Sequence, residues 1–209
     1  MNNYHIETFS VGYLATNCYV ITNKTNEAVI IDAGGGYDRI KKYLDGLGKK
    51  PVAVLCTHGH FDHVLDARKW QIDGAKVYIH KDDEDFLTGK ETIMPGRNLL
   101  ITPVTPDKLL NDGEEIDVAG LKFTVIHTPG HSKGSVCYLL EDDVIFSGDT
   151  IFLGSYGRTD FFGGNFSELV RSVKKILALP GDRKVLTGHG ESTTLQQERR
   201  FNPLRTLHD

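Results

Sequence analysis

The sequence contains no apolar run that approaches the roughly 20 residues needed to cross a bilayer. Its first residues, MNNYHIETFSVGYLATN, have neither the basic start nor the apolar segment that is typical of an export signal. Cysteine is sparse, and the odd number argues against a disulfide framework and for a reducing compartment. The three cysteines are Cys18, Cys56 and Cys137. We therefore expect a cytoplasmic protein that does not bind membranes.

An excess of positive charge is also missing. The chain has 24 Lys and Arg against 28 Asp and Glu, and its net charge is −4. No global positive field would therefore attract nucleic acid, and we expect the partner to be a small molecule. The sequence has no linker and no low-complexity segment, and its 209 residues are enough for a full core. We expect a single domain over residues 1–209.

Short apolar runs bounded by Gly, Asn or Asp dominate the sequence and predict β-strands. They cover residues 13–22, 27–36, 51–58, 75–80, 121–127, 134–140, 143–149 and 183–190. Helical spacing of apolar residues predicts helices over 37–48, 66–72 and 165–181, with Asn165 as the N-cap of the last. Residues 90–110 carry three prolines and are predicted to be an irregular lid or connector. The pattern indicates two sheets with helices outside.

Histidine and aspartate concentrate in the segment THGHFDH, residues 57–63. His58 and His60 lie two positions apart, so an extended backbone would place both side chains on one face, where they can bind one ion. Asp62 and His63 follow the turn and can point at a second position. Gly59 is expected to give this loop the freedom to bend. Imidazole and carboxylate groups suit Zn²⁺, so the segment predicts a metal site.

One loop cannot complete two coordination shells, so we expect further ligands in other loops that follow strands. The candidates are His131 in TPGHS, Asp149 in SGDT and His189 in TGHG. Each follows an apolar run and lies beside a glycine, and strand ends held by a rigid sheet are where binding residues usually collect. We interpret the remaining histidines as ordinary hydrogen-bonded groups. They are His5, His80, His127 and His208.

These motifs, in this order, resemble those of the metallo-beta-lactamase superfamily. THGHFDH matches its His-x-His-x-Asp-His motif, and TPGHS, SGDT and TGHG match its later ligand motifs. VIIDAGGG, which contains Asp32, resembles the first motif. The resemblance covers nearly the whole chain. It implies an α/β protein with an αβ/βα four-layer sandwich, in which two mixed β-sheets carry outer helices and a dinuclear metal site lies along one edge.

The resemblance also implies a set of metal ligands. One metal would be bound by His58, His60 and His131, the other by Asp62, His63 and His189, and Asp149 would bridge the two. We expect two Zn²⁺ ions, with iron or manganese as alternatives. Asp32 would orient this set through hydrogen bonds, or it is a simple turn carboxylate before GGG. The classical β-lactamases of the superfamily have cysteine at one ligand position, which corresponds here to Asp149, and this difference disfavours antibiotic degradation.

Within the superfamily, GDTIFLGSYGRTDFFGG and GHGESTTLQQERRFNP resemble the short bacterial glyoxalase II-like, or hydroxyacylglutathione hydrolase-like, enzymes. The longer enzymes have a basic residue nine positions after the bridging aspartate and a tyrosine two further on, where this chain has Arg158 and Asp160. They also carry a C-terminal helical extension that contacts glutathione, which we expect this chain to lack.

We expect Arg158 to bind a substrate carboxylate, because its planar guanidinium can do so through two hydrogen bonds. The alternative is a surface ion pair, for instance with Asp160. The ERR run at residues 198–200 is interpreted as a solvated charged face, and the alternative is that it binds substrate.

The predicted function is hydrolysis of a small acyl thioester such as S-lactoylglutathione, with Asp62 and Asp149 as the catalytic carboxylates. Two metals about 3.5–4 Å apart can share a hydroxide that attacks the carbonyl carbon. The same ions would stabilise the developing oxyanion. The first alternative is a persulfide dioxygenase with one iron held by His58, His131 and Asp149. The others are an RNase Z-type nuclease, for which no basic surface is visible, and a metal-binding domain without catalysis.

Overall fold

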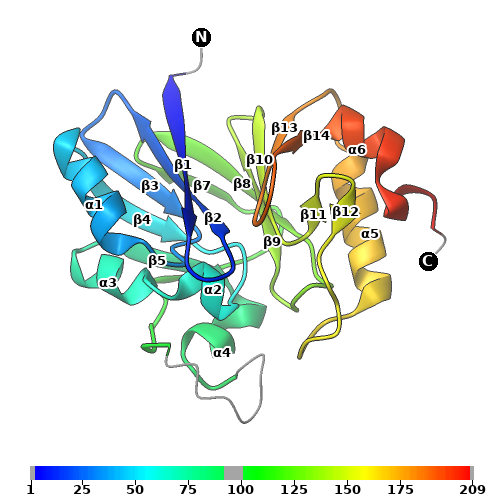
Figure 1. The fold of residues 1–209 in the computed structure, drawn as a ribbon, viewed down its shortest axis with the longest axis horizontal. Helices are drawn as coiled ribbons and strands as arrows, with labels where there is room; N and C mark the ends of the chain where they lie inside the picture. The colour runs from blue at the N-terminus through cyan, green and yellow to red at the C-terminus, as the bar shows by residue number, and fades with distance from the viewer. Residues whose placement is uncertain (1–2, 92–100, 208–209) are drawn as a thin grey trace.

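Two six-stranded sheets face each other in the computed structural model, which describes residues 3–91 and 101–207 (Figure 1). The first sheet has the order β1 (Tyr4–Val11), β2 (Thr16–Asn23), β3 (Glu27–Ile31), β4 (Lys50–Leu55), β5 (Lys76–His80) and β6 (Lys108–Leu110). The second has the order β14 (Thr193–Thr194), β13 (Lys184–Thr187), β10 (Val144–Gly148), β9 (Val136–Leu140), β8 (Leu121–His127) and β7 (Glu115–Val118). The hairpin β11 (Ile151–Phe152) and β12 (Ser155–Tyr156) follows β10.

Both sheets are mixed. In the first, β1, β2 and β3 pair antiparallel, whereas β3, β4, β5 and β6 pair parallel. In the second, β10 and β13 are parallel and the other neighbours are antiparallel. Parallel strands end at the same edge of a sheet, so the segments after β3 and β4, and those after β10 and β13, are brought together there. This edge carries the histidine-rich motifs.

Helices cover the outer face of each sheet (Figure 1). Helices α1 (Tyr37–Gly46) and α3 (Ala67–Ile72) lie on the first sheet, whereas α2 (Phe61–Val64) follows the end of β4, and η1 (Lys81–Asp83) and α4 (Glu84–Leu87) follow the end of β5. The second sheet carries α5 (Phe166–Leu177), α6 (Leu195–Phe201) and η2 (Pro203–Thr206). The inner core, which includes Tyr19, Phe123 and Phe146, lies between the sheets, and Trp70 belongs to a separate core under α1 and α3. The predicted four-layer αβ/βα sandwich is therefore confirmed.

The first strand was not predicted from the sequence. β1 is mostly half-exposed and alternates polar and apolar residues, so it has no continuous apolar run. The strand predicted over 13–22 begins only at Thr16, because residues 12–15 form the loop between β1 and β2. β7 and α6 were also missed. Each is short and has only two buried side chains, so its apolar pattern is weak.

The proline-containing segment acts as a connector where the structure describes it. Val104 is buried and donates its N–H to Leu87, and Asp107 donates to the carbonyl of Val77. The segment then forms β6, a strand where irregular structure was predicted. None of residues 101–110 lines the cavity at the candidate site. Residues 92–100, on which the lid interpretation also depended, lie outside the described residues.

The three cysteines are buried and free, in agreement with the absence of a disulfide framework. Burial raises the pKa of each thiol, which makes all three poor nucleophiles. Within residues 3–91 and 101–207, no helix is both long and apolar enough to span a bilayer.

Helix α5 begins at the predicted N-cap, because the Asn165 side chain accepts the N–H of Glu168 at 3.1 Å. Replacing Asn165 with alanine removes that acceptor and should lower the free energy of unfolding by about 1 kcal/mol. Urea denaturation measures the change. Arg171→Ala, an exposed position of the same helix, is the control and should stay within about 0.5 kcal/mol of the unmodified protein. Equal stability of both variants would contradict the capping role.

Candidate metal centre

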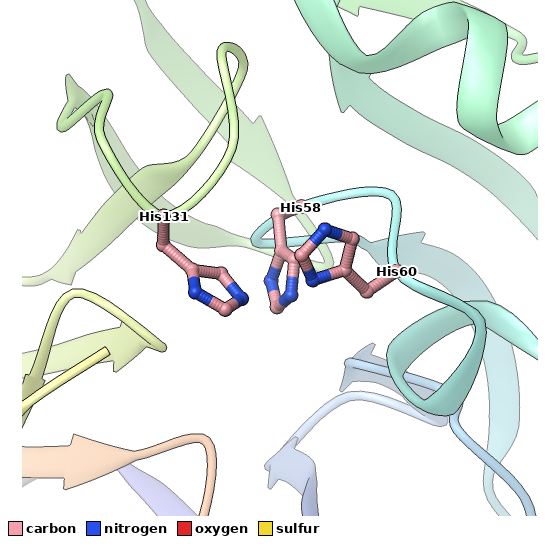
Figure 2. Close-up of side chains that lie close together, drawn as sticks. All are labelled: His58, His60 and His131. Atoms are coloured by element: carbon pink, nitrogen blue, oxygen red, sulfur yellow. The ribbon is translucent and has the colours of Figure 1, made fainter. Parts of the chain in front are cut away.

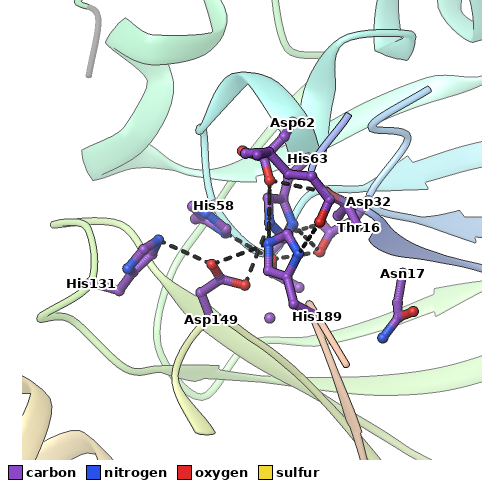
Figure 3. Close-up of polar contacts among 12 residues, drawn as sticks. Thr16, Asn17, Asp32, His58, Asp62, His63, His131, Asp149 and His189 are labelled. Atoms are coloured by element: carbon purple, nitrogen blue, oxygen red, sulfur yellow. Dashed lines mark hydrogen bonds and ion pairs between the residues drawn. The ribbon is translucent and has the colours of Figure 1, made fainter. Parts of the chain in front are cut away.

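The seven predicted ligands meet at one edge of the sandwich; Figure 3 labels all of them except His60, which is labelled in Figure 2. His58 and His60 follow β4, and Asp62 and His63 lie on α2, which continues the same segment. The other three come from the second sheet. His131 follows β8, Asp149 follows β10 and His189 follows β13. The site is therefore assembled from both sheets, and its geometry depends on how the two sheets pack.

The first group consists of His58, His60 and His131, whose potential ligand atoms lie within 4.8 Å of one another. Figure 2 shows His131 pointing across the sheet edge at the two histidines of the β4 loop. The Nε2 atoms of all three are buried and have no hydrogen-bond partner among the described residues. Such a buried polar atom costs about 1–3 kcal/mol. Three of them pointing together fit a bound cation better than a closed protein interior.

The second group consists of Asp62, His63 and His189. The Nε2 atoms of His63 and His189 are 3.3 Å apart, and Asp62 Oδ2 lies 3.4 Å and 3.3 Å from them. Two nitrogen ligands on a tetrahedral Zn²⁺, with bonds of about 2.0–2.1 Å, lie about 3.3–3.4 Å apart. The triangle therefore has the dimensions of three ligands around one ion.

Asp149 lies between these two groups. Its Oδ2 is 3.4 Å from His131 Nε2 and 3.6 Å from His189 Nε2, and its Oδ1 is 3.4 Å from His63 Nε2. Oδ1 is buried and has no hydrogen-bond partner in the described structure. A carboxylate that reaches nitrogen ligands of both groups has the position required of a bridge between two metals.

The opposite ring nitrogens of the histidines are held by acceptors. The Nδ1 of His63 donates to Asp32 Oδ2 at 2.8 Å, that of His131 donates to the Arg158 carbonyl at 2.7 Å, and that of His189 donates to the Leu14 carbonyl at 3.1 Å. Each contact fixes the tautomer, so the lone pair of Nε2 faces the centre.

Asp32 is buried and orients the β4 segment. Its carboxylate accepts the Thr57 N–H at 2.7 Å and the Thr57 hydroxyl at 2.8 Å, in addition to His63. The Thr57 oxygen in turn lies 3.1 Å from His58 Nδ1. The backbone of Asp32 is left-handed, with φ of 57°, a conformation that non-glycine residues adopt at a cost of about 1–3 kcal/mol. The structure thus supports the orienting interpretation over that of a simple turn residue.

A second buried carboxylate, Asp83 in η1, was not identified from the sequence. Its Oδ2 accepts the Gly59 N–H at 2.8 Å and the Ser132 hydroxyl at 2.7 Å, and its Oδ1 accepts the Gly134 N–H at 2.6 Å. It therefore joins the loop of His58 and His60 to the loop of His131. Asp83 lies in the charged run KDDED, which is typical of a solvated surface, so nothing in the sequence indicated that its carboxylate is buried.

Gly59 has a different role from the one predicted. A Cβ at this position would lie 2.5 Å from the Phe86 Cβ and 3.0 Å from the Asp83 carbonyl oxygen. Its φ is not in the left-handed range. Glycine is required here by the close approach of α4 rather than by backbone freedom.

The start of β2 contributes two further contacts that sequence reasoning missed. The Thr16 hydroxyl donates to Asp62 Oδ2 at 3.0 Å. The Asn17 amide donates to the carbonyls of Thr187 and Gly190, on either side of His189, at 3.0 Å each. The start of β2 therefore positions two members of the second group, Asp62 directly and His189 through its backbone.

Burial and charge set the protonation of the histidines. Burial lowers the pKa of His58 and of His60 well below the usual value, so both are neutral, the form that binds metals. Burial also acts to lower the pKa of His63, but the carboxylates of Asp149, Asp32 and Asp62 together raise it to about 10. The three carboxylates thus favour a positive charge at this position, which is a proton on His63 when no metal is bound and which a bound metal would replace.

A cavity of about 670 Å³ opens beside the candidate centre. This is within the usual range for small-molecule sites. Five of the predicted ligands line this cavity, and the rest of its wall is largely apolar and aromatic. The remaining lining residues are Leu14, Phe61, Phe152, Ser155, Tyr156, Arg158 and Phe161.

Arg158 borders this cavity but already has a partner. Its Nε and Nη2 donate to the two carboxylate oxygens of Asp160, each at 2.6 Å, and its guanidinium carbon lies 3.8 Å above the ring centroid of Phe161. The ion pair given above as the alternative role of Arg158 is thus present. Its position on the cavity wall leaves substrate binding as a proposal.

The first two residues of the ERR run, Glu198 and Arg199, neither form a solvated charged face nor lie where they could bind substrate. Glu198 is fully buried and accepts the N–H of Gly154 and the Thr193 hydroxyl. Arg199 donates to the carbonyls of Leu177, Leu179 and Gly181, at the end of α5. These residues attach α6 to the fold, and none of the three lines the cavity.

Among the remaining histidines, His80 and His127 lie close to Asp82 in a possible third group. Their rings are stacked, with centroids 4.1 Å apart and planes within 11°. Nitrogen lone pairs lie in the ring plane, so two stacked imidazoles do not converge on one ion. His127 Nε2 contacts the Lys133 carbonyl at 2.8 Å, as an ordinary hydrogen-bonded histidine does. His208 lies outside the described residues.

The sequence is similar to a known protein family and to several proteins of that family. The model of the metallo-beta-lactamase superfamily matches residues 11–189. The probable metallo-hydrolase YqgX of Bacillus subtilis is 36% identical, over 92% of this chain and 93% of the relative. The hydroxyacylglutathione hydrolase GloC of Haemophilus influenzae is 35% identical, over 95% of this chain and 97% of the relative.

Two crystal structures are similar over nearly their full length. The B3 metallo-beta-lactamase BLEG-1 superimposes with a TM-score of 0.86 at 38% identity, over 97% of this chain and 100% of that chain. A di-iron-bound form of TTHA1623 superimposes with a TM-score of 0.82 at 35% identity, over 94% and 98%.

The contacts of Asp83 predict that it positions the first ligand group. In Asp83→Asn, an amide N–H₂ replaces one oxygen and faces groups that themselves donate. We expect the metal affinity of the first group to fall by roughly 10–100-fold and that of the second group to stay the same. Losses of this size are typical when a residue that hydrogen-bonds to a metal-binding loop is replaced. Titration against a chromophoric chelator measures both sites, and Asp82→Asn is the neighbouring exposed control. Two sites of unchanged affinity in Asp83→Asn would show that Asp83 only supports the loop.

Proposed function

This chain belongs to the metallo-beta-lactamase superfamily and is a metal-dependent hydrolase, and from that premise we propose that it hydrolyses a small acyl thioester such as S-lactoylglutathione. The observation that carries the proposal is the meeting of two ligand groups and Asp149 beside a cavity with apolar walls. The similarity to a hydroxyacylglutathione hydrolase supports a thioester as the substrate class.

We propose that the centre holds two divalent metals, with zinc as the expected ion. The first group, which consists of His58, His60 and His131, would bind one metal. The second group, which consists of Asp62, His63 and His189, would bind the other metal, and Asp149 would contact both. Bound there, the ions supply Lewis acidity and a nucleophile at neutral pH. The di-iron form of a similar protein supports iron as the alternative.

The chain's own residues have separate roles in this proposal. Asp149 fixes the spacing of the two groups, because its oxygens contact nitrogen atoms of both. Burial raises the pKa of Asp62, but His63 and the hydrogen bonds from His189 and Thr16 outweigh this effect and keep it below its ordinary value. Asp62 therefore remains ionised and supplies charge rather than a proton.

The cavity wall would bind the substrate. Leu14, Phe152 and Tyr156 offer an apolar surface to an acyl group or to the chain of a thiol. We propose that Arg158 is the group on this wall that can bind a carboxylate of the substrate, which would have to displace Asp160 from it. A thiolate leaves without strong acid assistance, since a thiol has a pKa of about 8.5. A thioester therefore makes modest demands on these residues.

β-Lactam hydrolysis is the second candidate, because a chain that is 38% identical is described as a B3 metallo-beta-lactamase. It requires the same attack on a carbonyl carbon. Persulfide oxidation at His58, His131 and Asp149 is the mononuclear alternative.

A panel of acyl thioesters, β-lactams, lactones and phosphodiesters, assayed with the zinc, iron and manganese forms, separates these functions. We expect the highest kcat/KM for a thioester. A higher value for a β-lactam would favour the second candidate. Oxygen consumption with glutathione persulfide in the iron form, without thioester hydrolysis, would favour the oxidative one.

Removing Asp149 should be more damaging than removing one histidine from either group. In Asp149→Ala both groups lose the carboxylate between them, whereas His58→Ala and His189→Ala each affect one group. Metal content by elemental analysis and turnover of the three variants provide the comparison. If Asp149→Ala retains two metals and near-normal turnover, Asp149 does not bridge.

A further inference from the structure

The cavity beside the ligand groups has one fixed positive charge on its wall. Among the described residues that line it, Arg158 is the only lysine or arginine. An anionic part of a substrate that reaches this cavity would therefore depend on this side chain.

The position of Arg158 relative to the ligand groups is fixed by its backbone. Its carbonyl accepts the Nδ1–H of His131 at 2.7 Å. The preceding residue, Gly157, passes so close to Asp149 that a Cβ would lie 1.8 Å from the Asp149 carbonyl oxygen. The backbone at Arg158 is thus packed against the ligand loops, whereas its side chain is more than half exposed.

That side chain is held by its own loop. Asp160 uses both carboxylate oxygens on Nε and Nη2, and Phe161 stacks on the guanidinium at 3.8 Å. Asp160 thus occupies one of the two edges of the guanidinium, Nε with Nη2, through which a substrate carboxylate could make a bidentate contact. The hydrogen bond from Arg158 lowers the pKa of Asp160 to about 2, so the pair stays charged at any assay pH.

We propose that Asp160 is a specificity-determining residue, an internal carboxylate that competes with anionic substrates for Arg158 and so favours substrates that are uncharged beside the scissile bond. This inference rests on the proposed thioester hydrolysis. One residue separates Asp160 from Arg158, so their contact is intramolecular, and a substrate carboxylate has to compete with a group that is always present beside the guanidinium. Both side chains are more than half exposed, so the pair can open to admit a substrate.

Two thioesters that differ by one carboxylate test the proposal. They are the S-acetyl derivatives of N-acetylcysteamine, which is neutral, and of N-acetylcysteine, which is anionic. Asp160→Asn should lower KM for the anionic thioester by about two- to sixfold, the factor expected when an exposed ion pair leaves the cation free in only a fraction of the molecules. KM for the neutral thioester and kcat for both should hardly change, because the substitution affects binding alone.

Two further variants make the result specific. Asp117→Asn, at an exposed position of β7 in the second sheet, changes net charge equally and should have no effect. Arg158→Ala combined with Asp160→Asn should lose the gain, because the gain requires the released guanidinium. S-Butylglutathione is an anionic thioether that is not hydrolysed. Calorimetry should show that it binds Asp160→Asn more tightly than it binds the unmodified protein or the double variant.

The outcomes separate this inference from the proposed function. If the unmodified protein hydrolyses the neutral thioester but Asp160→Asn leaves the ratio of the two KM values unchanged, Asp160 does not set specificity. A gain that persists in the double variant would also overturn the role of Arg158. If the unmodified protein hydrolyses neither thioester in any metal form, the proposed function itself fails.

Discussion

The carboxylate of Asp32 is the contact on which the arrangement of the candidate centre depends most. It receives three hydrogen bonds, from the Thr57 N–H, the Thr57 hydroxyl and His63 Nδ1, and all three groups belong to the segment after β4. Imidazole and carboxylate groups that share a buried site need partners behind them, because each unsatisfied polar atom costs free energy. Asp32 supplies such partners for the second ligand group, and it does so from a left-handed backbone at the end of β3.

Asp83 is the counterpart of Asp32 for the first group. It connects the loops of His58, His60 and His131, which come from opposite sheets. The two carboxylates divide the support of the site between them, one within the first sheet and one across the sandwich (Figure 3 shows the Asp32 contacts). The position of His131 relative to His58 and His60 therefore depends on Asp83 as well as on the packing of the sheets.

Local patterns in the sequence predicted the ligand motifs and two sheets with outer helices, and the resemblance to the superfamily implied the four-layer sandwich. Short apolar runs mark buried strands, and the spacing of His58, His60, Asp62 and His63 is visible without a structure. What the sequence did not predict depends on contacts between distant residues. Asp83 looks like a surface charge, and Thr16 and Asn17 look like ordinary strand residues, until the fold places them against the ligand loops. The partner of Arg158 was named from the sequence only as an alternative, since spacing alone cannot tell an ion pair from a free cation.

The central claim is that two separate ligand groups, joined by Asp149, bind two metals. Anomalous diffraction at the zinc edge, from crystals of the zinc-loaded protein, tests it most directly. The account predicts two peaks about 3.5–4 Å apart, one among His58, His60 and His131 and one among Asp62, His63 and His189, with Asp149 in contact with both. A single peak at His58, His131 and Asp149 under zinc-replete conditions would contradict it.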